Sequence, residues 1–286
     1  MVSLHSWSYD MLLQKTIPQN RISFIVLGDS HLISRGKNAN HQHILNKNGN
    51  LYKRILNNIV SLTLAGNINP LFILHGGDAV DAGSAENFDA FVKLSKGVLE
   101  KAGIPIFVSL GNHDYHLADL STSNFEQYIG ATRESFLIPH TSVKIIRLNT
   151  HYSGIRDGEN YYGYFAKDDI ALLPKGDLKY HYLLDFHIPL RVCDFYNAAD
   201  NYHILSTTQT HKFLSNINPN VCGIFCHHRH THYSCAIKYH YKNQTYPLPF
   251  ITSGCAGNPT CRYPHFYNVT LDLRNYSLTS VLHHVS

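Results

Sequence analysis

The stretch Ile22–His31, ISFIVLGDSH, joins an apolar run to a short polar turn. The run Ile22–Leu27 is rich in β-branched residues and shows no strict alternation of apolar and polar positions. Such a run is typical of a strand that is covered on both faces, as strands are in parallel sheets. The polar residues from Gly28 to His31 are therefore predicted to follow the carboxyl end of a buried strand.

The next segments alternate between helical and strand patterns. Apolar residues at helical spacing predict helices over Tyr52–Leu64 and Phe88–Leu99. Short apolar runs predict strands over Leu71–Leu74 and Ile106–Leu110. This alternation is typical of a mostly parallel α/β sheet. Further strand-like runs lie at Val143–Leu148, Tyr182–Phe186, Val221–Phe225, Phe250–Thr252, Phe266–Leu273 and Ser277–Val285. Two mixed sheets with outer helices, a four-layer α/β/β/α sandwich, would hold this many strands, and residues 1–286 are predicted to form one domain.

Composition sets limits on partners and location. The chain has 24 basic and 20 acidic residues, a formal charge of +4, and this small excess gives no nucleic-acid-binding signature. Residues 1–20 lack the apolar core and cleavage site of a signal peptide, and no apolar stretch is long enough for a membrane span. We therefore expect a cytoplasmic protein; the oligomeric state is left open. Six cysteines would suit disulfides in a secreted protein, but without an export signal the reduced form is favoured.

Residues able to bind metal follow the predicted strands. They form five clusters: Gly28–His31 (GDSH), Gly76–Asp81 (GGDAVD), Gly111–Asp114 (GNHD), His187–Pro189 (HIP) and His227–His232 (HHRHTH). Each cluster alone is compatible with an ordinary turn or a solvated loop. Together they indicate one site, because the carboxyl ends of strands in an α/β sheet form a common crevice. Asp, His and Asn side chains are donors typical of sites for Mn²⁺, Zn²⁺ or Fe, and not of sites where cysteine thiolates bind a soft metal.

The order of these clusters resembles the motifs of the calcineurin-like metallophosphoesterases: D-x-H, G-D-x-x, G-N-H-D/E, a later H, and G-H-x-H. The matching residues run from 29 to 230. The resemblance implies two divalent metal ions, Mn²⁺ or Fe/Zn, and hydrolysis of a phosphate ester by a metal-bridged hydroxide. It assigns Asp29, His31 and His230 to one ion, Asn112, His187 and His228 to the other, and Asp78 to both. It also implies that His113 is the proton donor and that Asp114 orients it.

The last motif departs from the family pattern. His227 stands where the family has glycine, and the run HHRHTH allows two registers for the ligands, His228 with His230 or His230 with His232. In the family, an apolar run comes directly before this motif. Aligning the strand Val221–Cys226 with that run favours the first register, His228 with His230. The missing glycine also predicts strain, since the turn is expected to need a backbone conformation that histidine tolerates less well.

The motifs favour some substrates over others. GNHD rather than GNHE favours a phosphodiesterase for small or nucleotide substrates over a protein Ser/Thr phosphatase. The alternatives are a phosphomonoesterase or protein phosphatase using the same site, and a non-catalytic scaffold with the same fold. The filled ligand positions argue against the scaffold, and the lack of a tyrosine in Ala79–Asp81 argues against a purple phosphatase. Arg229 and His116 are candidates for substrate binding, and residues 115–180 are a candidate lid or substrate wall.

Overall fold

Two β-sheets that face each other form the centre of the molecule. The computed structural model describes residues 2–18, 20–116, 118–152, 163–192, 204–257 and 263–285. The first sheet has the strand order β15 (Leu278–His284), β14 (His265–Asp272), β1 (Arg21–Leu27), β4 (Ile73–His75) and β5 (Ile106–Val108). The second has the order β12 (His232–Tyr241), β13 (Gln244–Ser253), β11 (Val221–Cys226), β10 (His181–Asp185), β7 (Val143–Arg147) and β6 (Glu134–Leu137). Both sheets are mixed. In the first, the pairs β15–β14 and β14–β1 are antiparallel and the pairs β1–β4 and β4–β5 are parallel. In the second, the central pairs from β13 to β7 are parallel and the outer pairs β12–β13 and β7–β6 are antiparallel.

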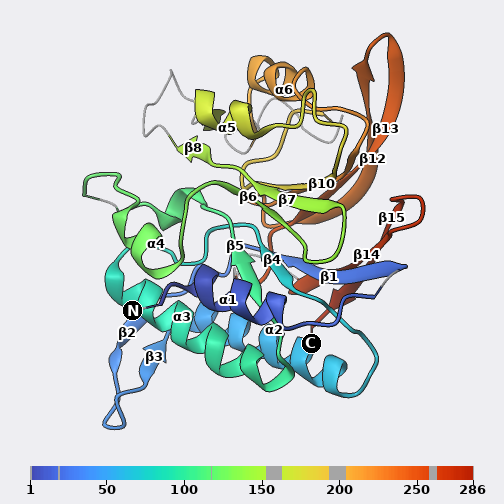
Figure 1. The fold of residues 1–286 in the computed structure, drawn as a ribbon. Coiled ribbons are helices and arrows are strands. Elements are labelled where there is room, and N and C mark those ends of the chain that lie inside the picture. Colours follow the sequence, from blue (N-terminus) through green and yellow to red (C-terminus); the bar gives the residue numbers. More distant parts are fainter. Residues whose placement is uncertain are drawn as a thin grey trace.

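Helices cover the outer faces of the two sheets (Figure 1). Helices α2 (Lys47–Leu64) and α3 (Ala85–Leu99) pack on the first sheet, and α5 (Lys167–Leu172) and α6 (Thr207–Leu214) lie over the second. The remaining elements are α1 (Leu4–Leu13), η1 (Glu100–Ala102), η2 (Asn112–Asp114), α4 (Ser123–Tyr128), and the hairpins β2 (Ser34–Lys37) with β3 (His43–Leu45) and β8 (Thr150–Tyr152) with β9 (Gly163–Phe165). The predicted sandwich of two mixed sheets with outer helices is confirmed.

Strand β1 shows why its sequence is almost continuously apolar. Ile25 and Leu27 pack with the helices α2 and α3, whereas Phe24 and Val26 pack in the core between the sheets. The Phe24 ring meets the Phe225 ring of the second sheet edge-on, with centroids 5.5 Å apart. Because both faces of the strand are covered, both sets of alternate residues must be apolar.

The two long helices begin before the periodic apolar pattern does. Helix α2 begins at Lys47 because the Asn46 side chain accepts a hydrogen bond from the Gly49 amide, at 2.8 Å. Helix α3 begins after Ser84, whose hydroxyl accepts from the Asn87 amide, at 3.3 Å. The caps rather than the apolar faces set these starts.

The segment 115–180, our candidate lid or substrate wall, is partly built into the body of the fold. Strands β6 and β7 belong to the six-stranded sheet, with β7 pairing in parallel with β10. Residues 117 and 153–162 of this segment lie outside the described residues. These two strands are therefore part of the central sheet, and the role of the rest of the segment as a lid or wall stays a prediction.

The cysteines are not all reduced. Cys255 is disulfide-bonded, whereas Cys222, Cys226 and Cys235 are free thiols. Cys193 and Cys261 lie outside the described residues. The expectation of reduced cysteines is therefore wrong for Cys255, because pairing depends on which sulfur atoms the fold brings within bonding distance.

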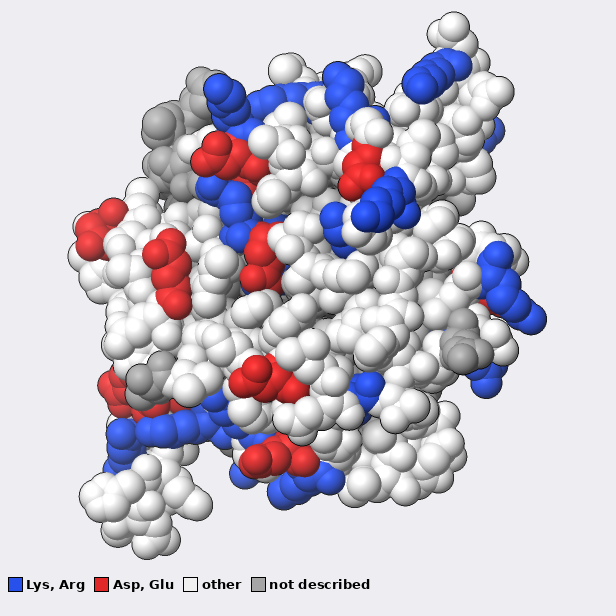
Figure 2. Space-filling view, in the orientation of Figure 1, with Lys and Arg blue, Asp and Glu red and all other residues white. Residues whose placement is uncertain are grey.

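The surface agrees with the modest charge of the chain. Figure 2 shows Lys and Arg side chains interspersed with Asp and Glu, so the basic residues do not gather into one patch on this face. Within the described ranges, none of the helices is both long and apolar enough to cross a membrane.

Candidate metal centre

The loops that follow five strands meet at one place. Backbone hydrogen bonds join two of them directly, since the Asp29 amide donates to the Gly77 carbonyl (3.0 Å) and the His31 amide donates to the Asp78 carbonyl (2.9 Å). The loops after β5, β10 and β11 bring Asn112, His187, His228 and His230 to the same place. The clusters that lie apart in the sequence are therefore neighbours in the fold.

Four side chains form a first donor group. One ligand atom from each of Asp29, His31, Asp78 and His230 lies within 4.8 Å of the others. The His31 Nε2 atom is 3.1 Å from His230 Nε2 and 3.6 Å from Asp78 Oδ2. The His230 Nε2 atom is 3.3 Å from Asp29 Oδ1. Two imidazole nitrogens and two carboxylate oxygens thus surround one point, a donor set that suits Mn²⁺, Fe²⁺ or Zn²⁺.

A second donor group shares Asp78 with the first. The His187 Nε2 atom lies 3.2 Å from Asp78 Oδ2, 3.0 Å from Asn112 Oδ1 and 3.1 Å from His228 Nδ1. On its other side, His187 Nδ1 donates a hydrogen bond to the Gly76 carbonyl, at 2.8 Å. This bond leaves the Nε2 lone pair directed at the group, as in many ligand histidines. The centre therefore has two donor groups joined by one carboxylate.

Two buried oxygens show that these residues fit a pair of cations. Among the described residues, neither Asp29 Oδ1 nor Asp78 Oδ2 has a hydrogen-bond partner, although both are buried. The nearest imidazole nitrogens, of His230 and His187, stand 3.3 and 3.2 Å away without hydrogen-bond geometry. Buried carboxylate oxygens without partners are costly unless a cation meets them. The arrangement is the one expected of ligands that converge on ions.

The carboxylates and imidazoles of the centre change one another's pKa values. Burial alone would raise the pKa of Asp78, but the adjacent His187 lowers it well below its usual range. Burial alone would lower the pKa of His187, but the Asp78 carboxylate raises it to about 9. Imidazolium charge therefore compensates the buried carboxylates when no metal is present. Metal ions would take over this role, since imidazoles lose a proton when they bind metal.

The backbone at the centre is strained. Five of the proposed ligands have positive φ angles: Asp29 (60°), His31 (43°), Asp78 (49°), His228 (69°) and His230 (48°). Such conformations cost free energy outside glycine and gather at functional sites. His227 is not among the positive-φ residues, so the predicted strain falls on the ligands and not on the residue that replaces glycine.

The structure places His113 beside the shared carboxylate. Its backbone amide donates to Asp78 Oδ1, at 2.8 Å, and its ring Nδ1 donates to the Asp81 carbonyl, at 3.1 Å. Its Nε2 atom is therefore the nitrogen left to exchange a proton with a substrate. The Asp81 carboxylate also lies 3.1 Å from His31 Nδ1, so His31, Asp81 and His113 form a further cluster. Because His31 meets the first donor group through Nε2, Asp81 orients both histidines from outside that group.

Asp114 contacts the backbone of two loops of the centre, and its role in orienting His113 stays a prediction. Its carboxylate accepts hydrogen bonds from the Gly111 amide (2.9 Å) and the Val80 amide (3.1 Å). Burial, and then the Asp78 carboxylate, raise the pKa of Asp114 to about 7. The side chain thus joins the loops after β4 and β5, and the oxygen beside the His113 ring belongs to Asp81.

The structure separates the remaining candidates. His228 and His230 lie in the donor groups, which is the first of the two registers, whereas His232 packs against His265, with centroids 4.7 Å apart. Arg229 lies between the two ligands in the chain and is partly buried. His116 is half-buried and pairs with Asp119, with 2.9 Å between Nδ1 and Oδ1, and it is in neither donor group.

His227 fills the space beneath the centre. A Cβ atom on Gly76 would overlap its ring, and one on Gly28 would lie 2.5 Å from its Nδ1 atom. The ring is fully buried, with Nδ1 2.6 Å from the Ser253 carbonyl and Nε2 3.1 Å from Asp185 Oδ1. The other Asp185 oxygen accepts from the Ser109 hydroxyl. One imidazole therefore contacts the ends of β1, β4, β10 and β13, which the sequence motif did not predict.

Replacing His227 should destabilise the protein strongly. We expect His227→Ala to cost roughly 3–5 kcal/mol, because it leaves the buried Asp185 carboxylate without its imidazole partner. At about 2–4 °C per kcal/mol for a chain of this size, Tm should fall by roughly 6–20 °C in thermal unfolding. Adding Asp185→Ala should cost less than the sum of the single changes. The exposed His240→Ala is the matched control, and an unchanged Tm for His227→Ala would contradict this role.

Comparison with known proteins agrees with the fold and the centre. A sequence model of the calcineurin-like phosphoesterases matches residues 22–250. The chain belongs to this family and is a metal-dependent phosphoester hydrolase. The resemblance that the motifs indicate is thereby confirmed.

Among solved structures, a dimetal phosphatase from Danio rerio matches with a TM-score of 0.58 and 12% identity, over 93% of this chain and 99% of that chain. A match at this identity supports the fold alone. Two others have lower TM-scores, and we base no inference on them: a phosphopantetheinyl hydrolase from Mycobacterium tuberculosis (0.44, 12% identity, 85% of this chain and 92% of that chain) and an archaeal phosphodiesterase (0.35, 11% identity, 92% and 100%). A comparison with curated protein sequences gives no match.

Proposed function

We propose that the chain is a dinuclear-metal phosphodiesterase that acts on small phosphodiesters, nucleotides among them. The observation that supports this most is the position of Asp78, whose Oδ2 atom lies 3.6 Å from His31 Nε2 and 3.2 Å from His187 Nε2. A carboxylate that faces both donor groups is suited to bridge two ions. When bound, such an ion pair supplies an activated water and neutralises charge on phosphoryl oxygens.

The protein's own residues would complete the reaction. His113 stands beside the shared Asp78, and its Nδ1–H is held by the Asp81 carbonyl. The ring is thereby oriented to give the Nε2 proton to the departing oxygen as a general acid. Burial alone would lower the pKa of His113, but Asp78 and the hydrogen bond to Asp81 raise it, which favours the protonated ring. This mechanism uses no covalent nucleophile, so Ser30, which donates to the Ala79 carbonyl, has a structural role.

The charge of the loops favours a diester over a monoester. Arg229 is the single Lys or Arg in the five ligand-bearing clusters. A phosphomonoester carries about −1.5 to −2 charge near neutral pH and needs more compensation than a diester monoanion. A single guanidinium in these clusters is better matched to the smaller charge, and a guanidinium can pair with a phosphoryl oxygen.

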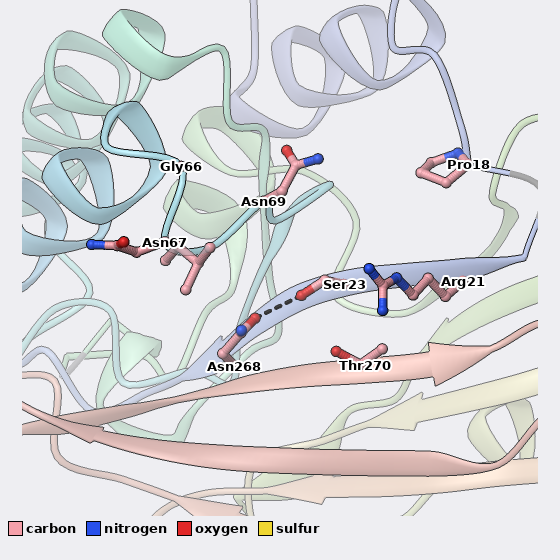
Figure 3. A pocket seen from close by; sticks show the side chains of 9 residues that line it. Pro18, Arg21, Ser23, Gly66, Asn67, Asn69, Asn268 and Thr270 are labelled. Atoms are coloured by element: carbon pink, nitrogen blue, oxygen red, sulfur yellow. Dashed lines mark hydrogen bonds between the residues drawn. The ribbon is translucent and has the colours of Figure 1, made fainter.

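A separate pocket is too far away to be the catalytic cleft. It has a volume of about 460 Å³ and is lined by Arg21, Ser23 and Asn268, among others (Figure 3). The Ser23 hydroxyl donates to Asn268 Oδ1 across it, at 2.6 Å. These residues stand near the start of β1, whereas the ligands follow its end. At about 3.3 Å per residue, Ser23 lies roughly 13 Å from Leu27, the last residue of β1, and the proposed ligands come after that end.

The substrate preference can be measured with two chromogenic esters. With Mn²⁺ present, we expect a higher kcat/KM for bis-p-nitrophenyl phosphate than for p-nitrophenyl phosphate. The reverse order, or activity on the monoester alone, would replace the proposed diesterase with a phosphomonoesterase that uses the same centre. Arg229→Gln should raise KM more than it lowers kcat, since it contacts substrate rather than the leaving group.

A further inference from the structure

Three histidines outside the dinuclear centre meet where the two sheets come together. His232 begins β12 of the second sheet, and His265 and His284 lie on β14 and β15 of the first. Their ring centroids are 4.7 Å (His232–His265), 5.5 Å (His232–His284) and 6.4 Å (His265–His284) apart. Of the two histidines of the HHRHTH run that neither donor group uses, His227 lies buried beneath the centre and His232 belongs to this cluster.

The register of the strands explains why these rings meet. His265 and His284 are direct partners across the antiparallel pair β14–β15. Directly opposed residues have Cβ atoms about 4.5–5.5 Å apart and point to the same face. The neighbouring His283 points to the opposite face and stacks on Phe266, with centroids 4.9 Å apart. The backbone therefore brings two of the three imidazoles together without help from a flexible loop.

His265 holds a nitrogen that lacks a partner. The side chain is fully buried, and its Nδ1 donates to the Tyr263 carbonyl, at 3.0 Å. In the part of the chain that the structure describes, its buried Nε2 atom has no hydrogen-bond partner. A buried polar atom without a partner costs about 1–3 kcal/mol. Burial lowers the pKa of His265 to about 4, so this nitrogen keeps its lone pair at neutral pH.

We propose that His232, His265 and His284 form a separate, mononuclear site for Zn²⁺ that joins the two sheets. Three imidazoles and an open fourth position are a common zinc coordination set, with Zn–N distances of about 2.0–2.1 Å. The three rings do not form one of the described groups whose ligand atoms lie within 4.8 Å of one another, so an ion would require His284, which lies exposed near the end of β15, to rotate toward the other two rings. The three described side chains of the cluster include no carboxylate, which distinguishes this donor set from the dinuclear centre and disfavours Mn²⁺.

Metal counting on the untagged full chain tests the site. After saturation with Zn²⁺ and gel filtration, wild type should carry one zinc more per chain than His284→Gln or His265→Gln. His283→Gln, on the same strand but the opposite face, is the matched control and should keep the wild-type number. With Mn²⁺ in place of Zn²⁺, all four proteins should carry equal amounts.

Two outcomes would overturn the proposal. Equal zinc counts in wild type and His284→Gln would show that the cluster holds no ion, and an equal loss in His283→Gln would show that surface histidines bind zinc without a defined site. Because His284 is exposed, His284→Gln decides the question even if the buried His265→Gln does not fold. The test is independent of the dinuclear centre, since failure of that centre would lower every count by two and leave the difference of one. Zn²⁺ should also raise Tm less in His284→Gln than in His283→Gln.

Discussion

Replacing Asp78 with asparagine should abolish turnover and lower the metal content while the fold is retained. The Asp78 Oδ2 atom lies within 3.6 Å of ligand nitrogens from both donor groups, so its charge serves both ions. Loss of a partner outside the first coordination sphere typically costs 10–100-fold, and loss of a shared ligand should exceed this range. We therefore expect kcat to fall by more than about 100-fold, together with a loss of bound Mn²⁺ in elemental analysis.

The matched control is Asp168→Asn, which removes a carboxylate that is 76% exposed and pairs with Arg133 on the surface. It should keep both its metal content and its activity. Circular dichroism should show the same secondary structure in the Asp78 variant as in wild type. Wild-type turnover in Asp78→Asn would contradict the assignment of the centre.

Replacing His113 with asparagine should slow turnover by about 10²–10⁴-fold, the usual contribution of a general acid, with both metals retained. The metals should remain because His113 belongs to neither donor group and reaches the centre through its amide on Asp78 Oδ1. An equal loss of metal and activity would instead make His113 part of the ion-binding set.

The pH profile separates a proton donor from a structural residue at this position. A general acid works in its protonated form, so wild-type kcat should fall as pH rises through the pKa of His113. In the metal-free protein Asp78 and the Asp81 carbonyl raise that pKa against the opposing effect of burial, and cations bound at Asp78 would lower it again, so the fall marks the pKa of His113 in the metal-loaded enzyme. His113→Asn should not show this fall in kcat at high pH. A fall at the same pH in the variant would exclude His113 as the general acid.

The convergence of the proposed ligand side chains could be predicted because each follows the end of an apolar strand. An apolar run followed by Asp29 or Asp78 places a carboxylate at a strand end, and the fold brings these ends together. The strands themselves followed from their apolar runs, since β1 is covered on both faces. The sequence was thus sufficient to predict those features that depend on one strand and the turn directly after it.

The rest depends on contacts between distant segments. His227 appeared as a lost glycine, yet the space for its ring comes from Gly28 and Gly76, and its partner Asp185 is an isolated carboxylate at the end of an apolar strand. The contact of His113 with Asp81 was not predicted because Asp81 approaches it from another loop. The cluster at His265 follows from the pairing of β14 with β15, and that register cannot be read from one strand alone.

The most direct measurement of the central claim is a Mn²⁺ titration of chelator-treated protein while bis-p-nitrophenyl phosphate hydrolysis is followed. If Asp78 joins two donor groups, activity should be absent without metal, rise with added Mn²⁺, and become constant at two ions per chain. Activity that persists in the metal-free protein, or that reaches its full value at one ion per chain, would contradict a dinuclear phosphoesterase.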